Sequence, residues 1–187
     1  MVRGALAAIS AVSLWPGFAA GDATADGFAA YVVPELGISC VLPAGYGIDD
    51  TPVAGPAAVR SVIWMEAPYA ALRVVFYCRP GVCAPVLAAY GVARRLGGGD
   101  EPPKVWDVVA AREANCDGAA EASFEFDDGG LYRGKVLCAA GAGVWYEVRA
   151  IWPRTDTHCE AAVEKVIRSF KVVPTNGDAP STMIIKE

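Results

Sequence analysis

Cysteine is the residue type whose number and spacing say most about the chemistry of this chain. There are six of them: Cys40, Cys78, Cys83, Cys116, Cys138 and Cys159. Four residues that include a Pro-Gly turn separate Cys78 from Cys83, whereas thioredoxin-type motifs have two intervening residues at a helix N-terminus. This spacing favours a structural disulfide that closes a loop between a strand and a helix over a redox or metal motif.

The other four cysteines leave more than one pairing open. Cys116 lies in a turn signal, and Cys138 lies near the same end of a neighbouring predicted strand. The two could be bridged if their Cα atoms come within about 7 Å of each other. Cys40 and Cys159 both lie on apolar patterns, so we expect either a bridge between strand and helix through the core or two buried thiols.

His158 is the only histidine, so a Ser-His-Asp or Cys-His enzyme would have to use it. It follows a predicted helix start and lies away from the apolar side of that helix, which predicts a surface position. One histidine together with bridged cysteines cannot supply the three or four ligands that zinc needs. We therefore predict no catalytic, cofactor-binding or metal-ligating residue.

Acidic pairs and a glycine run give no stronger signal. Asp49-Asp50 and Asp127-Asp128 indicate turns, because neither has the alternating oxygen ligands of a calcium loop. The glycines at 97–99 follow a predicted helix instead of opening one, so the helix dipole has the wrong sign for phosphate. Carboxylates for glycoside cleavage need not be adjacent, and the sequence nominates no such pair.

The elements that position these residues follow from hydrophobic periodicity. Strands are predicted at residues 36–43, 59–67, 71–78, 104–113, 121–126, 132–138 and 144–152. In the last three strands apolar and polar residues alternate, which indicates a sheet with one buried and one hydrated face. A three-residue loop at 128–130 is expected to place Phe126 opposite Tyr132 and Glu125 opposite Arg133.

A longer loop at 139–143 is expected to place Lys135 opposite Glu147, so that opposite charges meet on the hydrated face. Trp145 falls on this face, where it could either anchor a partner or pack under a helix. The predicted partner surface therefore consists of Trp145, Glu147, Arg149, Arg133 and Lys135.

Two helices are predicted. Pro85 suits the first turn of a helix over residues 85–96, which would place Val86, Tyr90, Ala93 and Leu96 on one face. The closing helix opens with a capping box at 157–160. Its apolar stripe consists of Cys159, Val163, Val166, Ile167 and Phe170.

The N-terminus has the three parts of a secretory signal: a positive Arg3, an apolar segment over residues 5–15 and small residues near position 20. The apolar segment is shorter than the about 20 residues of a membrane span, and no other segment is a candidate. We expect a signal peptide at 1–21, a flexible lead-in at 22–30, one globular domain at 31–174 and a tail at 175–187. This predicts a periplasmic or secreted protein.

Composition excludes some partners. The net charge is −5, and no run of basic residues is present, whereas nucleic acids and anionic membranes require clustered Lys and Arg. With 54% hydrophobic and 20% charged residues, the chain is expected to fold. The element order indicates an α+β protein in which helices pack against a twisted antiparallel sheet.

This order resembles the PsbP-like, or Mog-type, fold of photosystem II extrinsic proteins and many bacterial extracytoplasmic proteins. The matching marks are Gly-Ile-Ser-Cys-Val-Leu-Pro at 37–43, Tyr46-Gly47, Tyr132-Arg133, Trp145-Tyr146-Glu147-Val148 and Ile-Arg-Ser-Phe-Lys-Val at 167–172. These motifs extend over residues 31–173, and they are features of the fold rather than of an active site. The resemblance implies an α/β/α sandwich with an accessory or binding role and no shared active site.

The sequence therefore predicts an exported, disulfide-stabilised, non-enzymatic binding or accessory protein whose partner is a protein or a small ligand. Two alternatives remain open. The first is an exported hydrolase with a carboxylate-based site at a sheet edge. The second is a secreted enzyme inhibitor whose loop at 79–82 protrudes.

Overall fold

The computed structural model describes residues 26–49, 58–64, 68–96, 101–111, 118–141 and 143–173. The expected signal peptide, Cys116, the glycine run at 97–99 and the C-terminal tail lie outside these residues. Within them, neither helix is long and apolar enough to cross a bilayer.

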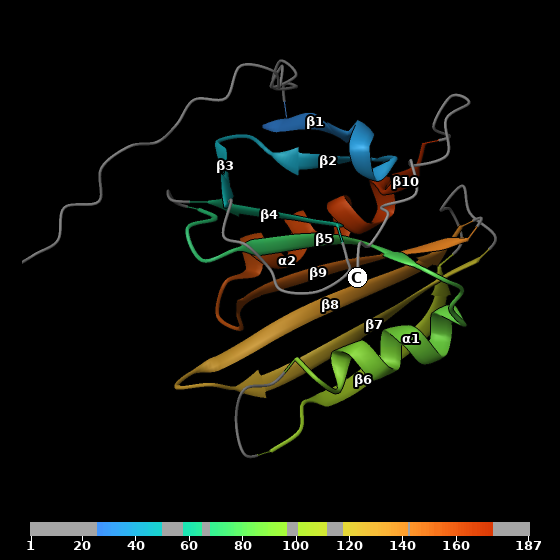
Figure 1. Ribbon diagram of the computed structural model, residues 1–187. Coiled ribbons are helices and arrows are strands. Elements are labelled where there is room, and N and C mark those ends of the chain that lie inside the picture. Colours follow the sequence, from blue (N-terminus) through green and yellow to red (C-terminus); the bar gives the residue numbers. More distant parts are fainter. Residues whose placement is uncertain are drawn as a thin grey trace, which may run out of the picture.

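Seven antiparallel strands form one long twisted sheet, in the order β3-β4-β5-β9-β8-β7-β6 (Figure 1). Runs of β-branched and aromatic residues give these strands their propensity. Their bounds are β3 (Tyr46–Asp49), β4 (Ala58–Trp64), β5 (Arg73–Pro80), β6 (Lys104–Ala111), β7 (Gly118–Asp127), β8 (Leu131–Ala140) and β9 (Val144–Pro153).

A second sheet, of three strands, consists of β1 (Phe28–Val33), β2 (Ile38–Pro43) and β10 (Lys171–Val172) in the order β1-β2-β10. A 3-10 turn at Pro34–Leu36 joins β1 to β2, and Gly37 ends it at φ +64°. Strand β1 corrects the expected lead-in, since residues 28–30 are already paired with β2. Strand β3 likewise lies between two predicted strands, in a segment for which no strand was predicted.

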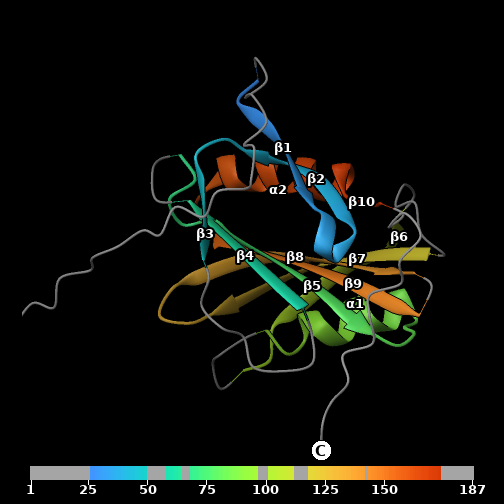
Figure 2. The same cartoon turned by 45° about the horizontal axis from the view of Figure 1, so that its top comes forward.

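Helices α1 (Pro85–Ala93) and α2 (Thr157–Ser169) lie on opposite sides of the long sheet. Figure 2 shows α2 on the same side as the three-stranded sheet and α1 on the other side. Pro85 occupies the first turn of α1, as expected. The cap of α2 is Asp156 rather than Thr157, because the Asp156 carboxylate accepts a hydrogen bond from the Cys159 N–H at 3.1 Å.

Each face of the long sheet therefore has its own apolar core. The core on the α2 side includes Leu137 and Val148, and the core on the α1 side includes Phe124 and Val136. The architecture confirms the α+β fold class with helices packed against a twisted antiparallel sheet. The expected polar face is present on β7 and β8, where Glu121, Glu125, Arg133 and Lys135 lie partly exposed on the α2 side. Strand β9 differs, because its residues on that side are buried and apolar.

The hairpin between β7 and β8 has the predicted register, with Glu125 opposite Arg133 and Phe126 opposite Tyr132. Gly129 supplies the left-handed backbone of its loop, at φ +67°. The apolar stripe of α2 is buried as predicted, from Cys159 to Phe170.

The buried face of α1 differs from the prediction. Ala89, Val92 and Ala93 pack against the sheet, whereas Val86 and Tyr90 are exposed. The nine residues of α1 include no charged side chain, so hydrophobicity alone does not determine which face turns inward.

Candidate functional site

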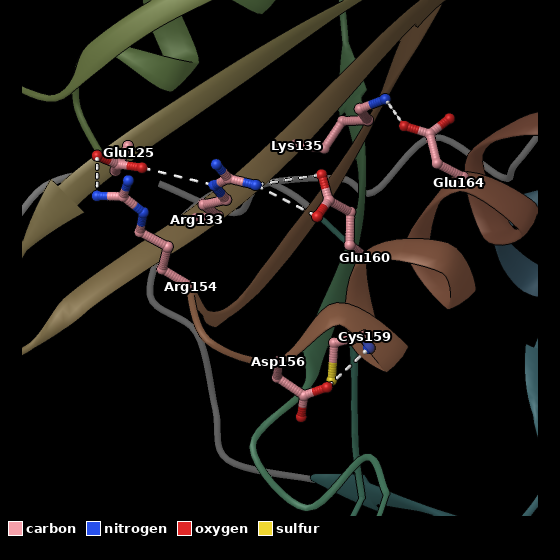
Figure 3. A network of polar contacts seen from close by, with 8 residues as sticks. All are labelled: Glu125, Arg133, Lys135, Arg154, Asp156, Cys159, Glu160 and Glu164. Carbon is pink, nitrogen blue, oxygen red and sulfur yellow. Dashed lines mark hydrogen bonds and ion pairs between the residues drawn. The ribbon is translucent and has the colours of Figure 1, made fainter.

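A polar network covers the part of the sheet that lies beside α2 (Figure 3). Arg133 of β8 donates from Nη1 to both carboxylate oxygens of Glu160 on α2, at 3.2 and 3.3 Å. Its Nε lies 3.5 Å from Glu125 on β7, which also accepts from Arg154 at 3.3 Å. The network therefore joins α2 to two strands of the sheet.

Lys135 continues this network along β8. Its ammonium contacts the carboxylates of Glu164 on α2 and Glu121 on β7, the latter at 3.2 Å. Burial alone would lower the pKa of Lys135, but the two carboxylates outweigh burial and raise the pKa. We name the seven residues of this network the α2-face network: Glu121, Glu125, Arg133, Lys135, Arg154, Glu160 and Glu164.

The five residues of the predicted partner surface do not share one face, because the β8–β9 register differs from the prediction. Strand β8 continues to Ala140, which pairs with Trp145, so Lys135 lies opposite Ala150 and Glu147 lies opposite Cys138. This offset of three positions is an odd number and exchanges the two faces of β9 relative to β8. Arg133 and Lys135 consequently face α2, whereas Trp145, Glu147 and Arg149 face the α1 side.

Glu147 is the centre of a second polar group, on the α1 side of the sheet. Its side chain is only 1% exposed and accepts hydrogen bonds from Arg79 Nε, at 3.1 Å, and from Arg149 Nε. Both guanidinium groups lie over the Tyr77 ring, at 4.8 and 4.4 Å from its centroid, and Arg79 also lies 5.5 Å from that of Trp145. We call these five residues the Glu147 cluster.

The Glu147 cluster bears on two expectations. Trp145 is half-buried and packs against the core on the α1 side, as the packing alternative anticipated. Arg79 turns inward to Glu147 instead of protruding from the loop at 79–82, and Gly81 donates to the Gly143 carbonyl at 2.9 Å. Val82 of the same loop is 88% exposed.

No two cysteines are joined by a disulfide within the described residues. Cys78 packs against the core on the α2 side, whereas Cys83 interacts with Cys138, which is in the core on the α1 side. The predicted link between Cys78 and Cys83 is therefore not formed, and the two thiols associate with opposite faces of the sheet. Burial, Glu147 and Cys83 together raise the pKa of Cys138.

Cys40 and Cys159 are both buried in the core on the α2 side but are not bridged. The Val41 N–H donates to Ser169 Oγ at 2.9 Å, so Cys40 lies beside the C-terminal end of α2. Cys159 lies ten residues earlier on this helix, about 15 Å along its axis. The alternative of two buried thiols describes this arrangement.

The single histidine and one of the acidic pairs lie at the surface, and several other sequence candidates lie outside the described residues. His158 is exposed on the first turn of α2, as predicted, and Asp127 and Asp128 are exposed at the β7–β8 turn. Cys116, Asp50 and the glycine run lie outside the described residues. No group of three or more His, Cys, Asp or Glu side chains in the described part of the chain is placed to hold a metal ion.

The outer side of α1 is a feature that the sequence predictions missed. Val82 is 88% exposed and Leu87 is 73% exposed, and Val86 and Tyr90 are each nearly half exposed. We call these four residues the α1 outer face. The sequence signal for it is the absence of any charged residue in the segment 85–93.

Comparison with known proteins gives structural neighbours only. No protein-family model and no curated protein sequence matches this chain. The solution structure of cyanobacterial PsbP (CyanoP) from Synechocystis sp. PCC 6803 superposes with a TM-score of 0.55 at 15% identity, covering 84% of this chain and 99% of that one. LpqN of Mycobacterium tuberculosis, described as involved in cell envelope biogenesis, gives 0.50 at 15% identity over 73% and 83% of the two chains.

A crystal structure from Bacteroides thetaiotaomicron VPI-5482 gives a TM-score of 0.49 at 10% identity. The match covers 80% of this chain, which spans only 49% of the length of that protein. The match to the cyanobacterial structure extends over nearly the whole of that chain. The chain has a PsbP-like fold, as its resemblance to that family implied.

Proposed function

We propose that this chain is an exported, non-enzymatic binding or accessory protein that binds a partner protein on the α1 outer face. The observation that carries the proposal is the exposure of four large apolar side chains within nine residues of sequence, Val82, Val86, Leu87 and Tyr90. Apolar patches of this kind on soluble proteins mark interaction sites.

Helix amphipathicity supports this proposal. A helix at the surface of a soluble protein normally has a polar outer side, and a helix that is apolar all round is normally covered. Helix α1 is apolar on both sides, but only Ala89, Val92 and Ala93 are fully buried against the sheet, and Ala88 is partly buried there. A partner that covers Leu87 and Tyr90 would remove this apolar area from water and stabilise the complex.

Charge indicates the kind of partner. Arg94 and Arg95 are exposed directly after α1, so they would border the covered patch. A partner protein with an apolar anchor and neighbouring carboxylates complements this border. A second copy of the chain complements it less well, because it would bring the same two arginines to the contact and both copies carry a net charge of −5.

The test is capture of a partner from periplasmic or secreted extract with the purified chain and two matched variants. Leu87→Glu places a charge in the α1 outer face, whereas Val32→Glu places the same charge on the exposed residue Val32 of β1. We expect one protein to be bound stoichiometrically by the parent and by Val32→Glu, and at least tenfold less by Leu87→Glu. Equal capture by both variants, or turnover of a defined substrate by the purified chain, would refute the proposal.

Export is part of the same proposal. It is supported by the order of charge, apolar segment and small residues at 1–21. The envelope role stated for LpqN agrees with it. The N-terminus of the protein recovered from its host should begin near Ala20 to Asp22, and a cytosolic protein that retains Met1–Gly21 would contradict export.

In an oxidising compartment we propose a disulfide between Cys83 and Cys138. Gly118 of β7 lies beside Pro85, since a Cβ at Gly118 would be 3.8 Å from Pro85 Cγ, and Ala120 two residues further pairs with Cys138. Cys83 therefore lies at the same end of the strands. Peptide mapping without reduction should find Cys83 linked to Cys138, and a Cys78–Cys83 link would contradict this assignment.

A carboxylate-based hydrolase is the second candidate, because Asp107, Glu160 and Glu164 line one cavity beside the edge strand β6. Glu160 and Glu164 are already engaged by Arg133 and Lys135. This leaves Asp107 as the carboxylate of the three without a salt bridge to any described residue. A pair of available carboxylates, which glycoside cleavage requires, is therefore not assembled in this geometry.

A further inference from the structure

The edges of the two sheets differ in how well they are protected against pairing with another chain. An edge strand presents a row of N–H and C=O groups, and natural proteins discourage pairing there with short strands, bulges, prolines and charges. Within the described residues the edge strands are β3 and β6 of the long sheet and β1 and β10 of the three-stranded sheet. Strand β3 has four residues and β10 has two, and a register shift between Trp106 and Val109 interrupts β6. These three edges are therefore protected.

Strand β1 has none of these protections. It is six residues long and pairs with β2 in one uninterrupted register. Its sequence, Phe-Ala-Ala-Tyr-Val-Val, contains no charged residue and no proline. Figure 1 shows β1 as the outermost strand of its sheet, beyond β2. Among the described strands, the edge of β1 is thus the one that lacks any feature opposing the addition of a further strand.

The ladder between β1 and β2 determines which backbone groups point to this edge. The Ala44 N–H donates to the Gly27 carbonyl at 2.9 Å, and these two residues continue the register of the ladder. Hydrogen-bonded pairs recur at every second residue of an antiparallel ladder. Pro43 agrees with this phase, because it has no N–H and lies opposite Phe28, between two bonded pairs. The residues of β1 that bond to β2 are therefore Ala29, Tyr31 and Val33.

Ala30 and Val32 consequently direct their N–H and C=O groups away from β2, toward the outer edge. Their side chains are also exposed, Val32 by 48%, whereas Tyr31 and Val33 are buried in the core on the α2 side. The outer edge of β1 thus combines backbone donors and acceptors with an adjoining apolar side-chain surface. A further antiparallel strand can use both.

A second copy of β1 fits this edge. When two copies pair antiparallel about a two-fold axis at Ala30, the two Ala30 residues lie opposite each other, and Phe28 of each copy lies opposite Val32 of the other. These three positions share one phase of the ladder, so each facing pair can exchange N–H···O bonds. An aromatic residue opposite a β-branched residue is a favourable cross-strand pair. The sequence of β1 is therefore self-complementary in this register.

Charges at the two ends of β1 favour the same arrangement. Asp26 precedes the strand and pairs with Lys165 of α2, and Glu35 follows the strand and pairs with Arg60 of β4. In an antiparallel pair the first end of one copy meets the second end of the other. Lys165 then approaches Glu35 of the other copy, and Arg60 approaches Asp26 of the other copy, so that opposite charges meet at both ends.

We propose that β1 pairs with β1 of a second copy across a two-fold axis at Ala30 and joins the two three-stranded sheets into one continuous sheet. The closed pair leaves neither β1 edge open. Figure 2 shows the three-stranded sheet on the side of the long sheet opposite α1. The inference is therefore independent of partner binding at the α1 outer face, and Val32→Glu weakens the strand pair while leaving that face intact.

Sedimentation equilibrium of the purified chain up to millimolar concentration tests this pairing. We expect the parent to show a monomer–dimer equilibrium. Ala30→Glu and Ala30→Lys each place like charges opposite each other at the axis, so each should weaken dimerisation at least tenfold. Both variants should fold, because Ala30 is exposed. A mixture of the two should form a heterodimer, because opposite charges then meet across the axis.

Leu87→Glu is the matched control, since it places a charge on an exposed apolar residue of the α1 outer face and should dimerise like the parent. A parent that stays monomeric overturns the proposal and leaves the edge to a strand of a different protein. Equal dimerisation of Ala30→Glu and the parent, or a mixture that associates no more strongly than its components, also overturns it. Loss of the dimer in Leu87→Glu alone would assign the contact to α1 and refute pairing through β1.

Discussion

Glu147 shows how a single charged residue can occupy a position that strand alternation assigns to solvent. Its side chain is only 1% exposed, but both guanidinium groups that bind it stay more than 20% exposed. The arginines therefore keep part of their hydration and still satisfy the carboxylate. This arrangement reduces the desolvation cost that makes many buried ion pairs unfavourable.

Replacing Glu147 should consequently be far more costly than breaking a surface pair. Glu147→Gln removes the charge that faces Arg79 and Arg149, and we expect the free energy of unfolding to fall by on the order of 3 kcal/mol. The matched control is Glu35→Gln, which breaks the exposed pair with Arg60 and should cost less than about 1 kcal/mol. Urea denaturation of both variants measures the difference, and equal costs would contradict the structural role of Glu147.

At the scale of the elements, β8 separates the two cores. One side of the strand carries Arg133 and Lys135 toward α2, and the other carries Val136 and Cys138 toward α1. Gly134 lies opposite Phe124 of β7, and the fully buried Phe124 ring lies over the glycine. The missing side chain at 134 thus makes room for the largest residue of the core on the α1 side.

A methyl group at this position should destabilise the protein. The Cβ of Gly134→Ala would overlap the Phe124 ring, and we expect a cost of about 1–3 kcal/mol from overpacking. Gly91→Ala is the matched control, because its Cβ would meet only Arg95 Nη1, at 3.5 Å, within helix α1. That change should stabilise by up to about 1 kcal/mol. The melting temperature should therefore fall for Gly134→Ala and rise for Gly91→Ala. A shift in the same direction for both variants would refute this packing.

The same elements show which predictions a sequence supports. Local patterns predicted the β7–β8 hairpin, where a three-residue loop fixes the register, and the buried stripe of α2. The β8–β9 register was not determined locally, because a glycine-containing loop at 139–143 can close at several offsets. The inward side of α1 was likewise undetermined, since all its sides are apolar. The ion pair that accompanies the burial of Glu147 comes in part from Arg79 on β5, which is distant in sequence.

For the whole molecule, burial in the two cores on either side of the long sheet determines whether the cysteine thiols stay protonated. Cys40 and Cys159 lie in the core on the α2 side, away from the Cys83–Cys138 pair on the other side. Burial raises the pKa of Cys40, and burial with the neighbouring Asp156 raises the pKa of Cys159 to about 12. Both thiols therefore stay protonated in the folded protein under conditions in which they ionise in the unfolded chain.

This difference predicts a loss of stability at alkaline pH. In the unfolded chain a cysteine ionises near pH 8.5, so the contribution of Cys159 is fully present below that pH and is lost as pH rises toward about 12. Each such thiol contributes a slope of up to about 1.4 kcal/mol per pH unit in this window. We expect the stability of the parent relative to Cys159→Ala to be constant from pH 6 to 8 and to decrease from pH 9 to 10.5. Urea unfolding under reducing conditions measures the free energy of unfolding of both proteins at each pH. If the difference between parent and Cys159→Ala does not change with pH, Cys159 is accessible to solvent.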